Sequence, residues 1–211
     1  MGAVMKVTIK QLKKKKHSTA NNVQLMPVVT NNLRSNEMFK KNITEIEHTF
    51  SMSQKPVIGE LFLTKSFPLD SEYDHIRNFF NQFNDWRQIT RERMKQYIGD
   101  EIAILCFLSP VAFRYYLPAF LIAALENIFE EKSFVLALNI GLTLHKPTKN
   151  FEPSSVQIRF EQFNVLTLQE KLAVKHYLQV VAELEIGDEL GAETALHSYW
   201  YDFIEPVKNS V

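Results

Sequence analysis

The chain has 211 residues, of which 45% are hydrophobic and 23% charged, as in an average globular protein. This composition excludes collagen-like and wholly disordered chains, because so much apolar surface has to be buried. The single cysteine, Cys106, excludes an intramolecular disulfide framework and a cysteine-based zinc cluster. The net charge of zero argues against a polyanionic partner.

The charges are unevenly distributed along the chain. Residues 1–50 contain nine Lys or Arg and three Asp or Glu, so they carry +6 and the remainder carries −6. Seven acids and no Lys or Arg lie between Glu183 and Glu205. One interpretation is intramolecular attraction together with solubility. The other is that the acidic end meets a basic protein partner, because complementary patches raise association rates.

The first third of the chain is predicted to have mixed structure. Alternating apolar and polar residues over 5–10 predict a half-exposed strand, and β-rich runs at 23–30 and 57–64 predict two more. Between them, Ser35 can cap a helix whose apolar residues recur at helical spacing. We therefore expect a β-containing extension over residues 1–65 and a mainly helical domain over 66–211.

Helix signals dominate the second part of the chain. Asp70 or Ser71 can cap an amphipathic segment, and Thr90 can cap a short helix that stops near Gly99. Residues 133–144 are apolar and fit either a strand or a helix. Residues 167–170 match a capping box, in which Thr and Glu satisfy each other's backbone donors, and a helix with one apolar face follows.

The centre of the domain is predicted around two prolines. Ser109 followed by Pro110 suits a helix start, and Pro118 predicts a kink or a restart, because proline removes a backbone donor. The expected fold class is mainly α (α+β overall). It consists of a kinked central helix pair over 110–130, packed by amphipathic helices at 70–84 and 168–184, with a small β element from the N-terminal third.

The apolar run from Ile102 to Leu125 is long enough to span a bilayer. Arg114 lies at its centre, where an arginine costs about 2.5–3.5 kcal/mol on insertion scales. Two prolines interrupt the run and Glu126 follows it, so we expect a buried core segment and no membrane partner. The chain begins with a strand-like segment and then a lysine run, the reverse of a signal peptide, and this order predicts a cytoplasmic location.

Sequence signatures of metal and cofactor sites are missing. No two of the six histidines are three or four residues apart, so no helix face presents a histidine pair. The chain has six glycines and neither a P-loop nor a dinucleotide-binding fingerprint, and it has no G-x-S-x-G elbow. We therefore expect no metal and no cofactor.

The central run contains an unusual polar group of Arg114, Tyr115 and Tyr116. Buried polar groups need partners. In the structural interpretation, Arg114 pairs with Asp85 or with a helix-end carbonyl and stabilises the kink at Pro118. In the functional interpretation, the three side chains line a pocket.

Several of these residues belong to motifs that resemble a known family. Asp85-Trp86-Arg87, F-L-S-P at 107–110 and F-R-Y-Y-L-P-A at 113–119 resemble an uncharacterised bacterial family of small proteins of unknown function. Val111 departs from the motif, which has an acid at that position. The resemblance covers roughly residues 70–185 and implies a bacterial origin and a small soluble domain. It is completed by Phe163, Leu166, Thr167, Gln169, Ala173 and Val174.

The leading functional hypothesis is a non-catalytic protein-binding module. Its expected task is to neutralise or regulate a protein partner, as a toxin-immunity protein does, with the oligomeric state left open. Aromatic anchors surrounded by acids suit such an interface, and we expect the aromatic residues to be exposed. The candidate partner-binding residues are Glu185, Asp188, Glu189, Glu193, Tyr199, Trp200 and Tyr201.

Two alternatives remain open. A small hydrolase or transferase could use Arg114, Tyr115, Tyr116 and a histidine such as His176, with arginine holding an anionic group and tyrosine or histidine moving a proton. It requires a pocket that brings Arg114 close to His176. An RNA-binding accessory protein could use the lysines at 13–16, but no aromatic residue is interleaved for base stacking, so nucleic acid is the less favoured partner.

Overall fold

The computed structural model describes residues 31–57, 60–62, 71–97, 104–126, 128, 131–146, 153–184 and 191–202. Most of these residues are helical, so the mainly α fold class is confirmed. The strands predicted at 5–10 and 23–30 and the lysine run at 13–16 lie outside the described residues.

The first described helix is α1 (Asn31–Thr49), which the helical spacing of apolar residues predicted. Phe39, Ile46 and, just after the helix, Phe50 are buried. The helix packs against α5 (Pro110–Leu125) and α8 (Leu168–Glu183). The predicted N-terminal extension therefore shares its core with the helical part, and the boundary at residue 65 stays a prediction.

The strand expected at 57–64 is wrong for the residues of that segment that the structure describes. Phe62 forms a single antiparallel bridge with Leu108, and the N–H of Ser109 donates to the carbonyl of Leu61 at 3.0 Å. The pairing ends there because Pro110 has no N–H and already begins α5.

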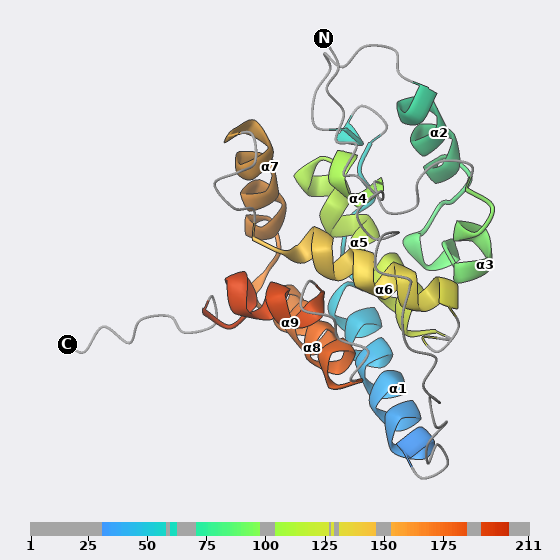
Figure 1. Ribbon diagram of the computed structural model, residues 1–211. Helices are drawn as coiled ribbons and strands as arrows, with labels where there is room; N and C mark the ends of the chain where they lie inside the picture. Colours follow the sequence, from blue (N-terminus) through green and yellow to red (C-terminus); the bar gives the residue numbers. More distant parts are fainter. Residues whose placement is uncertain are drawn as a thin grey trace, which may run out of the picture.

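Helix α5 lies at the centre of the fold (Figure 1). The hydroxyl of Ser109 caps it by accepting a hydrogen bond from the N–H of Ala112 at 3.2 Å. The predicted restart at Pro118 is wrong, because one helix runs from Pro110 to Leu125 with Pro118 inside it. Proline removes one backbone bond, but most residues on both sides are buried and their packing holds the helix together.

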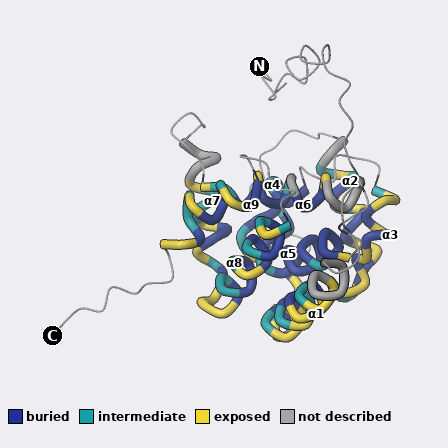
Figure 2. Tube along the Cα trace, turned by 60° about the horizontal axis from the view of Figure 1, so that its bottom comes forward, coloured by how far each residue is buried: buried dark blue, intermediate teal, exposed yellow. Residues whose placement is uncertain are grey.

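The remaining elements surround α5. Helix α5 contacts α1, α6, α7 and η3, and α9 packs between α6 and α8 (Figure 1). Their exposed residues lie on the outside and their buried residues face this centre (Figure 2). These elements are α2 (Ser71–Phe80), η3 (Trp86–Gln88), α3 (Arg91–Met94), α4 (Ile104–Phe107), α6 (Glu131–Leu144), α7 (Pro153–Asn164), α9 (Ala192–Ala195) and the π-helical turn η4 (Leu196–Trp200).

The ambiguous apolar run at 133–144 forms α6, which crosses close to the start of α9. A Cβ atom on Gly141 would lie 2.9 Å from the backbone N of Ala192 and 2.9 Å from the carbonyl C of Gly191. Glycine is thus required here because two backbones approach each other. None of the helices that the structure describes is both long and apolar enough to cross a membrane.

Candidate functional site

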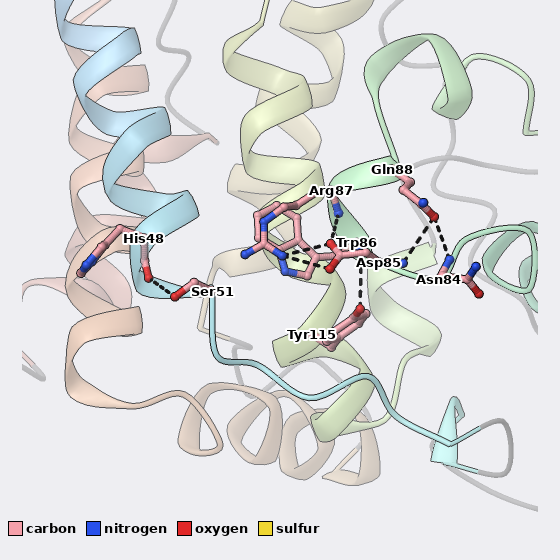
Figure 3. A network of polar contacts seen from close by, with 8 residues as sticks. All are labelled: His48, Ser51, Asn84, Asp85, Trp86, Arg87, Gln88 and Tyr115. Carbon is pink, nitrogen blue, oxygen red and sulfur yellow. Dashed lines mark hydrogen bonds and ion pairs between the residues drawn. The ribbon is translucent and has the colours of Figure 1, made fainter.

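The Asp85-Trp86-Arg87 motif forms a junction at the start of η3, which packs on α5. The carboxylate of Asp85 accepts the N–H of Arg87 at 2.8 Å, and the side chain of Gln88 accepts backbone N–H groups in return, which is a capping box. Trp86 is buried, and its backbone N–H donates to the phenol oxygen of Tyr115 at 3.3 Å (Figure 3). Tyr115 therefore fixes the junction to the central helix.

The charged side chains of this junction lie on the surface. The guanidinium of Arg87 lies 4.5 Å from the centre of the Trp86 ring and 3.0 Å from Asp85. Both charged side chains are exposed, so the ion pair itself adds little stability. Asp85 thus already has a cation as its partner.

Arg114 pairs with Glu170, whereas Asp85, one of the two partners considered for Arg114, pairs with Arg87. The Nε atom of Arg114 lies 2.9 Å from each carboxylate oxygen of Glu170. The side chain of Glu170 is 3% exposed, whereas that of Arg114 is 35% exposed. The contact joins the start of α8 to the N-terminal part of α5, and 56 residues separate the two partners in the sequence.

Two further donors hold the buried carboxylate of Glu170. The N–H of Thr167 lies 2.7 Å from one oxygen, completing the predicted capping box, and the hydroxyl of Ser53 lies 3.4 Å from the other. A buried charge is stable only when it is paired and its remaining lone pairs are satisfied. Arg114 is therefore held by an anion that is itself fixed by its own helix cap and by Ser53, which follows α1.

Arg114 also borders a cavity of about 360 Å³, which we call the Arg114 pocket. Its rim is apolar: the side chain of Met52 is 88% exposed and that of Val111 is 45% exposed. Within the described part of the chain, neither Nη atom of Arg114 makes a hydrogen bond. The pocket is lined by Met52, Ser53, Gln54, Val111, Arg114, Tyr115 and Val165.

The two tyrosines of the motif have different surroundings. Tyr115 lines the pocket, and its burial raises its pKa despite the hydrogen bond from Trp86. Tyr116 is stacked on Phe80 with ring centres 3.9 Å apart, and burial raises its pKa to about 12. Both phenols therefore stay protonated at neutral pH, which suits them to donate a hydrogen bond rather than to accept a proton.

His176 is placed away from the pocket lining. Its Nδ1 atom lies 2.7 Å from a carboxylate oxygen of Glu45, so it links α8 to α1. Of the four residues in the hydrolase hypothesis, the structure brings Arg114 and Tyr115 together at one cavity.

The C-terminal candidates are only partly described. Glu185, Asp188 and Glu189 lie outside the described residues. Glu193 is exposed and lies 3.9 Å from His197.

The exposure expected for Trp200 is wrong, because this side chain is 0% exposed and its indole N–H donates to the carbonyl of Leu144 at 2.8 Å. Tyr199 is half-buried against Phe163, and Tyr201 is exposed.

A smaller cavity of about 80 Å³ lies between Trp86 and the end of α5. Glu126 borders it, and burial together with repulsion from Glu92 and Glu47 raises the pKa of Glu126. Among the described residues, no group of three His, Cys, Asp or Glu side chains is placed to hold a metal ion.

One wall of the Arg114 pocket, formed by residues 52–54, was not predicted from the sequence. These residues follow α1 without any motif, and they reach the pocket because α1 packs on α5 and α8. The one available signal was an apolar Met52 among polar neighbours.

Residues 40–204 match a family of unknown function (DUF6714). The match extends beyond both ends of the 70–185 range that the motifs indicated, and it includes the C-terminal half of α1. Searches of curated proteins and of solved structures find no match.

Proposed function

Because this chain belongs to the family of unknown function DUF6714, we propose its function from its own site. It is a non-catalytic protein-binding module that holds a segment of its partner in the Arg114 pocket. The observation that carries this proposal is the combination of a firmly held guanidinium with an exposed apolar rim at one cavity.

The pocket has the features of an interface centre. Arginine and tyrosine are enriched among residues that contribute most to binding, and apolar neighbours exclude water around them. Single exposed apolar residues are common on protein surfaces. Here, however, Met52 and Val111 border the same cavity as Arg114, so a partner that covers them also desolvates the guanidinium.

The hydrolase alternative is supported less well than protein binding by the residues that it needs. Proton transfer near neutral pH requires a group whose pKa lies near that pH. The pKa of Tyr115 is raised instead, and His176 pairs with Glu45 between two helices. We therefore favour binding over catalysis.

The finer form of the proposal is an immunity or regulatory protein of the bacterial cytoplasm that neutralises a toxin or effector. The motif resemblance supports the bacterial origin, and the lone Cys106 suits a reducing compartment. The acidic stretch from Glu183 to Glu205 supports a partner that is basic overall.

The experiment compares three forms of the tagged full-length chain purified from the native host. Met52→Asp places a charge on the pocket rim, and Leu142→Asp is the matched control on an exposed position of α6. We expect a stoichiometric protein partner with the wild type and the control, and at least about tenfold weaker binding with Met52→Asp. Equal binding by all three forms, or no stoichiometric partner, would refute the proposal.

A further inference from the structure

We propose that the Arg114 pocket recognises a carboxylate side chain, an Asp or Glu of the partner segment, whose apolar neighbour packs on Met52 and Val111. This inference rests on the proposed function and names the chemistry that the pocket selects. The partner's overall charge can still be basic, because the pocket holds a single side chain.

The guanidinium of Arg114 uses only its Nε–H donor in hydrogen bonds with the described residues. Arginine carries five N–H donors in a rigid plane. Its Nε–H is held by Glu170 at 2.9 Å, while the four N–H groups of the Nη atoms make no hydrogen bond among the described residues. The side chain is 35% exposed and lines the pocket, so part of it is open to a ligand.

Glu170 leaves Arg114 able to bind a second anion. Its carboxylate also accepts the N–H of Thr167 at 2.7 Å and the hydroxyl of Ser53 at 3.4 Å. The guanidinium is therefore one of three donors to this anion, and the pair is locked in place before any ligand arrives. A preorganised arginine loses little freedom when it binds a carboxylate.

The rest of the pocket favours a carboxylate on an apolar stem. The phenol oxygen of Tyr115 accepts the N–H of Trp86, so its own proton is the one left to donate to a ligand. Met52, Val111 and Val165 offer apolar surface to methylene groups. A cation would be repelled by the positive guanidinium of Arg114. A dianion would be repelled more strongly by the buried charge of Glu170 than a single negative charge would be, so a singly charged side chain fits best.

Val111 provides a test that leaves Arg114 itself unchanged. It lies on α5 three residues before Arg114, on the same helix face, and it borders the pocket. A glutamate at this position places an internal carboxylate within reach of the Nη atoms. Val111→Gln is the matched control, because glutamine is nearly the size of glutamate and carries no charge. Val111 is exposed, so this position tolerates both substitutions.

The probes are two capped tripeptides, acetyl-Leu-Glu-Leu-amide and acetyl-Leu-Gln-Leu-amide, titrated into the full-length chain. NMR of the Arg114 Nε–Hε group reports binding at the pocket. We expect a saturable shift with the Glu peptide, and about tenfold weaker binding of the Gln peptide, because a charge-assisted hydrogen bond is lost. Because both variants lose the apolar contact of Val111, they are compared with each other, and Val111→Glu should bind the Glu peptide about tenfold more weakly than Val111→Gln.

Two results would overturn the inference. The first is equal binding of the two peptides, or no saturable shift with either. The second is equal binding of the Glu peptide by the two Val111 variants. If Met52→Asp still weakened the native complex in either case, protein binding at the pocket would stand and the carboxylate assignment alone would fall.

Discussion

Replacing Arg114 with alanine should lower the stability of the fold. The substitution leaves the carboxylate of Glu170 in place, 3% exposed, with the N–H of Thr167 and the more distant hydroxyl of Ser53 as remaining partners. Breaking a buried ion pair by removing one partner is costly, because the other charge stays buried without compensation.

The expected loss is about 2–4 kcal/mol of unfolding free energy. Fully buried pairs cost about 3–5 kcal/mol on losing one partner, and we take a lower range because Arg114 is one-third exposed and water can enter where it was. In a chain of this size, such a loss lowers Tm by roughly 4–16 °C. Glu170→Gln should cost less, about 1 kcal/mol, because glutamine keeps the capping box and water can solvate the guanidinium.

Urea unfolding of the two single variants and the double variant measures the interaction directly. The double variant should be less destabilised than the sum of the singles, by about 1–2 kcal/mol, because the interaction is lost only once. An additive cycle, or Glu170→Gln costing more than Arg114→Ala, would refute the buried-carboxylate reasoning. An unchanged Tm in Arg114→Ala would mean that the pair contributes no stability.

Three further predictions concern other parts of the fold. Gly141→Ala should lower the unfolding free energy by about 1–3 kcal/mol, since its Cβ would lie 2.9 Å from the backbone N of Ala192; a higher Tm, as helix propensity alone predicts, would contradict this. Acrylamide should quench the fluorescence of Trp86 and Trp200 weakly, because both are buried; strong quenching in Trp86→Phe would show that Trp200 is exposed. Glu126→Gln should raise Tm at pH 7 and lose this advantage below pH 4.5, because a carboxyl with a raised pKa costs stability once it ionises; an equal difference at both pH values would contradict it.

Local features of the fold could be predicted from the sequence. Ser109 and Thr167 each cap the helix that their side chains predicted, because capping depends on residues within one turn. The burial of the central apolar run followed from its composition alone. The restart predicted at Pro118 was wrong, because the lost backbone hydrogen bond is a local effect and the packing that offsets its cost comes from other helices.

The candidate site depended on contacts between distant segments. Glu170 was predicted as part of a capping box, and nothing near it in the sequence indicates that the start of α8 meets Arg114. Trp200 was expected to be exposed because acidic residues surround it in the sequence, yet η4 directs it to Leu144 at the end of α6. In both cases the partner is determined by tertiary packing, which the periodicity of the sequence does not indicate.

Hydrogen exchange of the chain, alone and bound to its native partner, tests the location of the binding site most directly. Residues 51–57 follow α1 outside regular structure, and residues 52–54 of this segment form one wall of the Arg114 pocket. We expect binding to slow amide hydrogen exchange in this segment, because the partner covers Met52 and excludes water from the pocket. Unchanged exchange at 51–57, with protection confined to residues 191–202, would contradict binding at the Arg114 pocket. It would place the interface at the acidic C-terminal end instead.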